Sequence, residues 1–281
     1  IELDYQNSEK DKRAAELAAA NRKLAFENHE KEARAAELLE AIAGLEAFAF
    51  ISSHDLQEPV RKILLWLDQL RPAMERSFSD KEKQRFDRVI GAAYRMRQLI
   101  GDLYTYSRVN HIGQDMGKVS LNEVLAAVVE DLGPRLAETG GLVEAGDLCP
   151  AYGVRAHFGL LLEHLVDNGL KFARPGVPPR IRVAATRVAG ESNPVLDPKA
   201  AYCRLIVEDN GIGFDTAGAD RIFEIFQRLH AQDAYPGTGI GLALVRKITL
   251  ACKGVVEVQS TPGSGSIFTL YFLLPSGFAV A

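Results

Sequence analysis

A histidine followed directly by an aspartate, His54 and Asp55, is the first group in this sequence that could do chemistry. Asp55 would accept the proton at Nδ1 of the imidazole, orient the ring and leave Nε2 free to attack. The pair therefore predicts a nucleophile, His54, with Asp55 as its general base and orienting group. Taken alone, it is more typical of an ordinary surface histidine.

The segment Glu163–Phe172, which we interpret as helical, offers groups for a metal–nucleotide complex. The amide oxygen of Asn168 suits Mg²⁺, which keeps several waters and bridges nucleotide phosphates. Lys171 adds a positive charge near phosphate. A polar stripe on a surface helix explains the same residues as well. His157 and His164 have no companion residues for a site of their own, and we interpret both as structural.

Asp209, Gly211 and Gly213 directly follow an apolar, strand-like run. A carboxylate at the end of a strand can accept a hydrogen bond from an exocyclic amine. The two glycines allow the backbone to pass close to a flat ring. The alternative is a plain turn, because Asp-Asn-Gly is good turn chemistry.

A glycine-rich loop opens the last expected helix, and it consists of Gly237, Thr238, Gly239, Ile240 and Gly241. Glycines at a helix N-terminus leave backbone N–H groups free to face phosphate, and the helix dipole adds to the attraction. The loop lacks the Gly-Lys-Ser/Thr ending of a P-loop, and it does not follow a strand as a dinucleotide-binding loop does. It therefore predicts a phosphate site outside the common nucleotide folds.

The amino-terminal segment shows a heptad period, which predicts a two-stranded coiled coil over residues 1–46. The a and d positions are Ala14, Asn21, Asn28, Ala35, Ile42, Ala49 and Leu17, Leu24, Lys31, Leu38, Leu45, Ser52. Asparagine at two a positions favours a fixed register and two strands. A solvated single helix is the alternative.

A helical hairpin is expected over residues 47–112. The helical phase continues at Leu56, Ile63 and Leu70, and it places His54 at the f position. Pro59 predicts a kink, and a break is expected over Arg71–Ser79. Ser79 and Glu82 form a capping box that begins the second helix. Two such hairpins can close a four-helix bundle, so we expect a homodimer.

The remainder of the chain mixes helices and strands, which predicts an α+β protein with one layer of helices on a sheet over residues 120–281. Residues 113–119 are interpreted as a linker. The expected helices begin at the Ser120–Glu123 capping box and span Val154–Phe172 and Gly239–Lys253. The expected strands are Arg180–Val188, Tyr202–Glu208, Val255–Ser260 and Ser266–Leu274, with a loop at Gly190–Lys199 and a turn at Pro262–Gly265.

The composition is that of a globular protein, with 47% apolar and 25% charged residues and a net charge of −4. This charge gives no electrostatic reason to expect nucleic acid as a partner. No apolar run approaches the roughly 18–20 residues that span a bilayer. Cys149, Cys203 and Cys252 form no metal-binding spacing, which suits a reducing cytosol. We expect a cytoplasmic fragment that begins at Ile1 and follows an upstream segment, which could carry a membrane anchor.

In their order along the chain, these clusters resemble the H, N, G1, F and G2 boxes of sensor histidine kinases. The segment Arg221–Arg228 resembles the F box, and Ser53–Arg61 is most similar to kinases attached to phytochrome-like or PAS-type sensors. The resemblance covers about residues 45–274. It implies a phosphoacceptor (HisKA-type) hairpin followed by an ATPase (HATPase_c) domain with the Bergerat-type α/β sandwich.

The resemblance also implies roles for single residues. Asn168 matches the Mg²⁺-binding asparagine, Glu163 the acidic residue near the metal, and Lys171 a nucleotide-contacting lysine. Asp209 matches the adenine-recognising aspartate, with Gly211 and Gly213 shaping its pocket. Arg228 matches an arginine that reaches the phosphates, and residues 229–236 match the ATP lid.

The implied activity is phosphorylation of His54 by ATP, followed by transfer to an aspartate on the receiver domain of a response regulator. An upstream sensor domain in the same chain would supply the signal. Glu58 stands four residues after His54, where members with phosphatase activity carry Asn or Thr, which puts that activity in doubt. The alternatives are an inactive ATP-binding dimeric switch and a chaperone or mismatch-repair type ATPase, although the latter lack a histidine hairpin.

Overall fold

Two long helices begin the chain in the computed structural model, which describes residues 2–109, 116–216, 219–227 and 237–275. Helix α1 spans Glu2–Ser77 and α2 spans Asp80–Arg108. The break between the helices is shorter than the predicted 71–79, because α1 continues through Pro59 and Pro72 to Ser77. A proline has a helix-compatible φ and gives up only one N–H, so a long helix with other contacts can tolerate it.

Residues 1–51 of α1 form a compact unit of their own. Several predicted seam residues are exposed in this single chain, namely Leu17, Leu24, Leu38 and Ile42. A second helix would cover them, but the coiled coil itself stays a prediction. Within the described part of the chain, no helix combines the length and the apolar character needed to cross a membrane.

The start of α2 confirms the predicted cap at Ser79. The Glu82 carboxylate accepts hydrogen bonds from the Ser79 backbone N–H at 2.8 Å and from the Ser79 hydroxyl at 2.6 Å. A small core holds the second half of α1 against α2. Its buried members are Val60, Leu64, Ala93 and Ile100. The predicted hairpin is therefore present in the chain.

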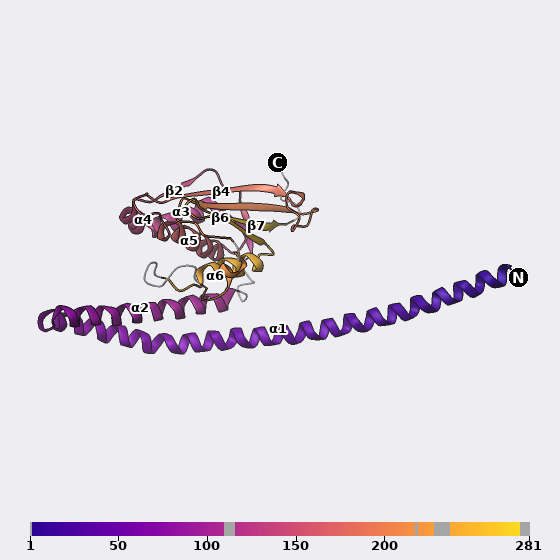
Figure 1. Ribbon diagram of the computed structural model, residues 1–281, viewed down its shortest axis with the longest axis horizontal. Helices are drawn as coiled ribbons and strands as arrows, with labels where there is room; N and C mark the ends of the chain where they lie inside the picture. The colour runs from indigo at the N-terminus through magenta and orange to yellow at the C-terminus, as the bar shows by residue number, and fades with distance from the viewer. Residues whose placement is uncertain (1, 110–115, 217–218, 228–236, 276–281) are drawn as a thin grey trace. The chain divides into compact units, whose positions relative to one another are not determined.

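The rest of the chain forms a five-stranded sheet with the order β2-β4-β5-β7-β6. Only β2 and β4 are parallel. The strands are β2 (Leu142–Ala145), β4 (Arg180–Ala189), β5 (Ala201–Asp209), β6 (Val255–Thr261) and β7 (Gly265–Leu274). The helices α3 (Leu121–Asp131), α5 (Arg155–Lys171) and α6 (Gly241–Ala251) gather on one face of this sheet, as Figure 1 shows. The predicted α+β class and single helical layer are confirmed.

Four short elements were not predicted: β1 (Gly117–Val119), α4 (Gly133–Thr139), β2 and β3 (Ala151–Gly153). Strand β1 corrects the interpretation of residues 113–119 as a linker, because its register with β3 pairs Val119 with Ala151. A pair of three-residue strands is too short to show the alternation by which strands are detected in a sequence.

Helix α5 supplies the centre of the core between helices and sheet. Phe158, Leu161 and Leu162 are fully buried, and the Phe158 ring meets the Phe272 ring of β7 edge-on at 4.9 Å. The segment from Gly190 to Ala200 connects β4 to β5 and includes a short 3-10 turn, η2 (Gly190–Ser192). The packing fixes the position of α5, and with it the polar face that this helix turns away from the core.

Candidate nucleotide site

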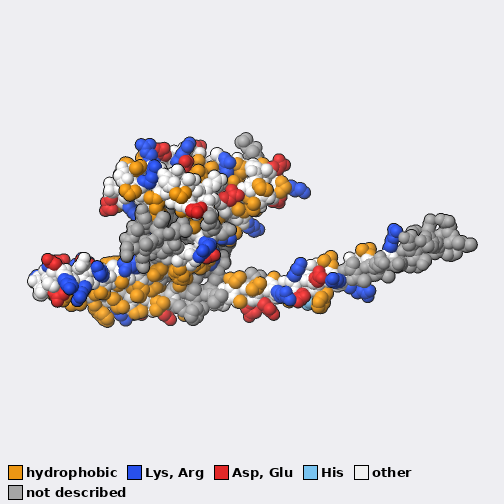
Figure 2. Space-filling model, viewed as in Figure 1, with side chains coloured by type: hydrophobic (Ala, Val, Ile, Leu, Met, Phe, Trp, Pro, Cys, Tyr) orange, Lys and Arg blue, Asp and Glu red, His pale blue; other side chains and the backbone are white. Residues whose placement is uncertain are grey.

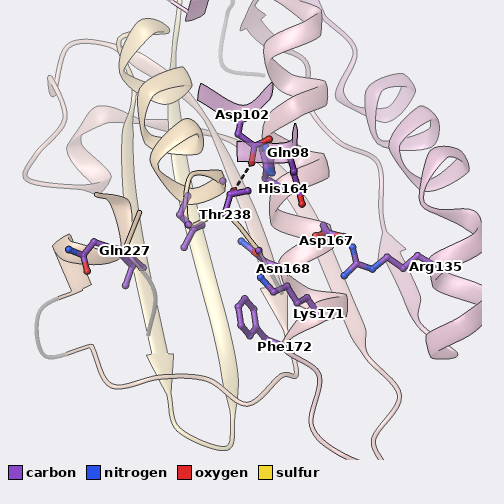
Figure 3. Close-up of a pocket in the computed structure, with 15 residues that line it drawn as sticks. Gln98, Asp102, Arg135, His164, Asp167, Asn168, Lys171, Phe172, Gln227 and Thr238 are labelled. Atoms are coloured by element: carbon purple, nitrogen blue, oxygen red, sulfur yellow. Dashed lines mark hydrogen bonds and ion pairs between the residues drawn. The ribbon is translucent and has the colours of Figure 1, made fainter. Parts of the chain in front are cut away.

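A cavity of about 260 Å³ lies where α5 meets the loop that enters α6 (Figure 3). Its lining comes from separate parts of the sequence, which only the fold brings together. The lining residues are Gln98, Asp102, Arg135, His164, Asp167, Asn168, Lys171, Phe172, Ile222, Gln227, Gly237, Thr238, Gly239, Gly241 and Leu242. Six of the residues predicted to bind nucleotide therefore share one cavity: Asn168, Lys171, Gly237, Thr238, Gly239 and Gly241.

One face of α5 forms a wall of this cavity. His164, Asn168 and Lys171 follow the i, i+4, i+7 spacing of a single helical face. His164 therefore lies in the wall of the cavity, a position that its interpretation as structural did not anticipate, and its spacing to Asn168 was the signal for this position. His157 is buried, and burial lowers the pKa of its imidazole. Glu163 is exposed and does not line the cavity.

Asp167 is a cavity residue that the sequence did not indicate. Its carboxylate forms an ion pair with the Arg135 guanidinium of α4, and both side chains are partly exposed. Arg135 also lines the cavity, so this wall carries a carboxylate with its counter-charge already in place. The pairing depends on the fold, because Arg135 lies in an element too short to be recognised from its sequence.

The glycine-rich loop supplies the opposite wall. A side chain on Gly237 would place its Cβ 2.4 Å from the Lys171 Nζ, so the loop passes directly against that lysine. Gly239 has a φ of 74°, and the Phe226 N–H donates a hydrogen bond to its carbonyl at 3.0 Å. Gly241 is the first residue of α6. The N-terminus of α6, which is the positive end of its dipole, therefore lies at the cavity.

Helix α2 contributes a third wall through Gln98 and Asp102. The Thr238 hydroxyl donates a hydrogen bond to the Asp102 carboxylate at 2.5 Å. Burial raises the pKa of Asp102, and the hydrogen bond from Thr238 opposes that rise. No motif marks these two residues in the sequence, because their relation to Thr238 exists only in the folded chain.

Asp209 ends β5 and lies beneath α5, next to the cavity but outside its lining. Its carboxylate accepts a hydrogen bond from the Gly211 N–H at 2.8 Å and further bonds from Ser266. Burial raises the pKa of Asp209 despite these bonds. A Cβ on Gly169 would stand 3.4 Å from the Asp209 Cβ and 2.6 Å from the Ile181 Cγ1. Close packing of α5 on the sheet thus holds the aspartate at this place.

Gly211 and Gly213 allow backbone segments to approach one another. A Cβ on Gly211 would be 2.5 Å from the Phe172 carbonyl oxygen. Gly213 has a φ of 59°, and its Cβ would be 2.0 Å from the Thr261 carbonyl oxygen. Close backbone packing within the fold therefore explains why glycine is needed at both positions. This explanation is independent of the predicted approach to a flat ring.

Replacing Gly213 with alanine is therefore expected to destabilise the domain by about 2 kcal/mol or more. A left-handed backbone costs a non-glycine residue about 1–3 kcal/mol, and the contact with Thr261 adds to it. Chemical denaturation of the two proteins measures the difference. Gly146→Ala is the matched control, because Gly146 has open space around it. Equal midpoints for Gly213→Ala and the unmodified chain would contradict the expectation.

Some predicted positions lie outside the described residues, namely Arg228, the segment 229–236 and the side chain of His54. The backbone of His54 lies within α1, and Asp55 is exposed there. The predicted roles of His54, Asp55 and Arg228 stay predictions.

Comparison with protein families identifies the ATPase part of the chain. Residues 153–276 match the family of histidine kinase-, DNA gyrase B-, and HSP90-like ATPases. The match covers strands β4 to β7, helices α5 and α6 and the glycine-rich loop, and it contains most of the residues that line the cavity.

Individual relatives match a larger part of the chain than the family does. The phytochrome-like protein Cph1 of Synechocystis sp. is 33% identical over 235 residues, which are 84% of this chain and 30% of that protein. The methanogenesis regulatory histidine kinase FilI of Methanothrix harundinacea is 27% identical over 231 residues, 81% of this chain and 25% of that protein. The structure of full-length ShkA in complex with AMPPNP has a TM-score of 0.59 at 21% identity, over 80% of this chain and 45% of that one, which shows the shared fold.

Over most of its length the chain is therefore similar to phytochrome-like proteins and to sensor histidine kinases. It spans about 30% of the length of the phytochrome relatives that it matches.

Proposed function

We propose that this chain transfers the γ-phosphoryl group of ATP to His54 and then passes it to an aspartate on the receiver domain of a response regulator. The observation that carries the proposal is the cavity in which Asn168, Lys171 and the N-terminus of α6 converge. An amide oxygen, an ammonium group and a helix N-terminus together suit a metal-bound polyphosphate.

The charges of the cavity agree with this assignment. The Lys171 ammonium and the N–H groups of the Gly237–Gly241 loop would compensate negative charge on the phosphates. The cavity also contains carboxylates, Asp167 and Asp102, and these are engaged by Arg135 and Thr238. Arg135 compensates the charge of Asp167, so phosphate oxygens can enter beside α5 without meeting an uncompensated carboxylate there.

Mg²⁺ fits the donors that the cavity presents. The amide of Asn168 offers a hard oxygen atom to the cavity. Such a site suits an ion that takes its remaining ligands from water and nucleotide phosphates. Asn168 would hold Mg²⁺, which supplies charge compensation on the phosphates when bound.

Asp209 would recognise the base of the nucleotide. Its partly buried carboxylate lies beneath α5, next to Gly169, and would accept a hydrogen bond from an adenine amine. The structure of ShkA with AMPPNP is that of a related fold holding an adenine nucleotide, which supports ATP as the substrate.

Incubation of the full chain with Mg-ATP labelled at the γ-phosphate tests the proposal. The expected result is one acid-labile, base-stable label per phosphorylated chain, which can be transferred to a receiver domain. Absence of label under conditions in which the chain binds ATP would reject the kinase function and favour an inactive ATP-binding switch.

We further propose that the chain acts as a homodimer through its helical hairpin. Figure 2 shows hydrophobic side chains gathered along the outer face of α1 and α2. The exposed members repeat with the heptad spacing on both helices, namely Leu56, Ile63 and Leu70 on α1 and Val89 and Met96 on α2. Two hairpins would bury these stripes against each other in a four-helix bundle.

Replacing Ile63 with aspartate is expected to raise the dimer dissociation constant roughly 100-fold or more, because two unpaired carboxylates would be buried in the interface. Sedimentation velocity over a range of concentrations measures the change. Val195→Asp is the control, since Val195 is also exposed but lies in the segment between β4 and β5. A dimer of unchanged strength in Ile63→Asp would exclude this face as the interface.

A further inference from the structure

Two cysteines that are distant in the sequence meet in the ATPase domain. Cys149 lies after β2, and Cys203 lies in β5. Their sulfur atoms are 3.1 Å apart, within hydrogen-bonding distance for thiols. Both are free cysteines. This pair lies outside the cavity described above and has no part in the proposed phosphoryl transfer.

The backbone holds the two thiols in this position from both sides. The Leu148 N–H donates a hydrogen bond to the Asn122 Oδ1 at 3.0 Å, and the Cys149 N–H donates one to the Ala185 carbonyl at 3.2 Å. Cys203 lies in a central strand, with paired strands on both sides. Strand pairing therefore positions Cys203, and backbone hydrogen bonds position Cys149 against it.

The two thiols differ in exposure and acidity. Cys149 is half-buried, whereas Cys203 is completely buried. The hydrogen bond from Cys203 lowers the pKa of Cys149, and the positive charge of Arg187 acts in the same direction. The hydrogen bond to Cys149 and burial raise the pKa of Cys203. Because the thiolate is the reactive form, Cys149 would attack an oxidant while Cys203 stays protonated beside it.

We propose that Cys149 and Cys203 form a peroxide-oxidisable pair that closes to an intrachain disulfide. The Cys149 thiolate attacks a peroxide oxygen, the O–O bond breaks, and the leaving hydroxide takes up a proton, which gives a sulfenic acid at Cys149 and water. The Cys203 sulfur then attacks the Cys149 sulfur and displaces its hydroxyl group, which leaves as water with the proton of Cys203. In total, two thiols and one hydrogen peroxide give one disulfide and two water molecules.

Only a small movement is needed to close the bond. A disulfide has a sulfur–sulfur distance of about 2.05 Å, so the two atoms need to approach by about 1 Å. Segment 146–150 can supply this movement, because it lies outside the regular strands. The third cysteine, Cys252, is buried at the end of α6, where burial raises the pKa of its thiol. It serves as an internal control.

The test is intact-mass measurement of the full chain after treatment with hydrogen peroxide, followed by alkylation with N-ethylmaleimide under denaturing conditions. The unmodified chain is expected to lose about 2 Da, for the two thiol hydrogens, and to accept one alkyl group instead of three. Dithiothreitol should restore three. Cys252→Ser should behave in the same way and accept none after oxidation.

Cys149→Ser and Cys203→Ser should each fail to lose the two hydrogens, and Cys203→Ser should accumulate a sulfenic acid that dimedone traps. Peptide mapping of the oxidised chain should link Cys149 to Cys203. Three alkylated cysteines after peroxide, a bridge that includes Cys252, or a bridge between two chains would each overturn the proposal. The unmodified chain alone decides these outcomes, so the test does not depend on the folding of a variant.

Discussion

Replacement of His54 with glutamine is expected to abolish labelling from γ-labelled ATP and to leave nucleotide affinity unchanged. Glutamine keeps a helix-compatible side chain of similar length, but its amide is not a nucleophile toward phosphorus. The cavity residues belong to other elements, so the affinity for ADP should stay within about twofold. Filter assays of acid-labile label and calorimetric titration with ADP measure the two quantities.

His29→Gln provides the matched control, because His29 is exposed on the same helix, α1. Its labelling should equal that of the unmodified chain. Retention of acid-labile label in His54→Gln would place the phosphoacceptor elsewhere. Loss of ADP binding in the same variant would instead mean that the substitution disturbs the ATPase domain.

Replacement of Asp209 with asparagine is expected to weaken ADP binding by roughly 10–100-fold, since an unsatisfied hydrogen-bonding group at a buried site costs about 1–3 kcal/mol. The asparagine Oδ1 can still accept the hydrogen bond from the Gly211 N–H, so the turn keeps its anchor. Binding of GDP should change far less, because the lost contact is specific to the adenine amine. Titration calorimetry with both nucleotides measures this loss of discrimination.

Although Asp209→Asn should weaken nucleotide binding, it should not lower the stability of the domain without nucleotide. The folded-state pKa of Asp209 is raised, so its stabilising contribution is complete below the unfolded pKa and is lost as the pH rises through the folded pKa. Above the unfolded pKa, ionisation of the partly buried carboxylate carries a desolvation cost that disfavours folding. The Tm of Asp209→Asn without nucleotide should therefore equal or exceed that of the unmodified chain, with a difference that grows from pH 4 upward.

Glu208→Gln is the control for the nucleotide measurement, because Glu208 is exposed and lies on the opposite face of β5. It should leave the ADP affinity unchanged, and it should slightly weaken the pH dependence, because the charge of Glu208 contributes to raising the pKa of Asp209. An Asp209→Asn chain that binds ADP with unchanged affinity would remove Asp209 from the nucleotide site, whatever its effect on stability.

The parts of the fold that the sequence predicted are those with a strong local signal. Helix α5 has a long apolar face, and the β6–β7 hairpin has alternating strands around a Pro-Gly turn. Strands β1 and β3 became visible only in the structure, because each is short and pairs with a partner far away in the sequence. The break expected over Arg71–Ser79 was too long, because α1 continues through Pro72 to Ser77.

The same division holds for the cavity. Asn168, Lys171 and the glycine-rich loop belong to motifs and could be recognised in isolation. Arg135 and Asp102 could not, because each acts through a partner that is distant in the sequence, Asp167 or Thr238. His164 lies between these cases. Its helical spacing to Asn168 was present in the sequence, but a histidine without obvious companions gave no reason to look for it.

The strand order also has a consequence for how the chain folds. Strand β5 pairs on one side with β4, its neighbour in the sequence, and on the other with β7, which follows only after η3 (Ala219–Phe223) and α6. Nearby segments pair faster than distant ones, because less chain entropy is lost on closing the loop. Pulsed hydrogen exchange during refolding should therefore protect the β4–β5 amides before those of β7. Asp209 would acquire its Ser266 neighbour late, and nucleotide affinity would appear only in the last folding phase.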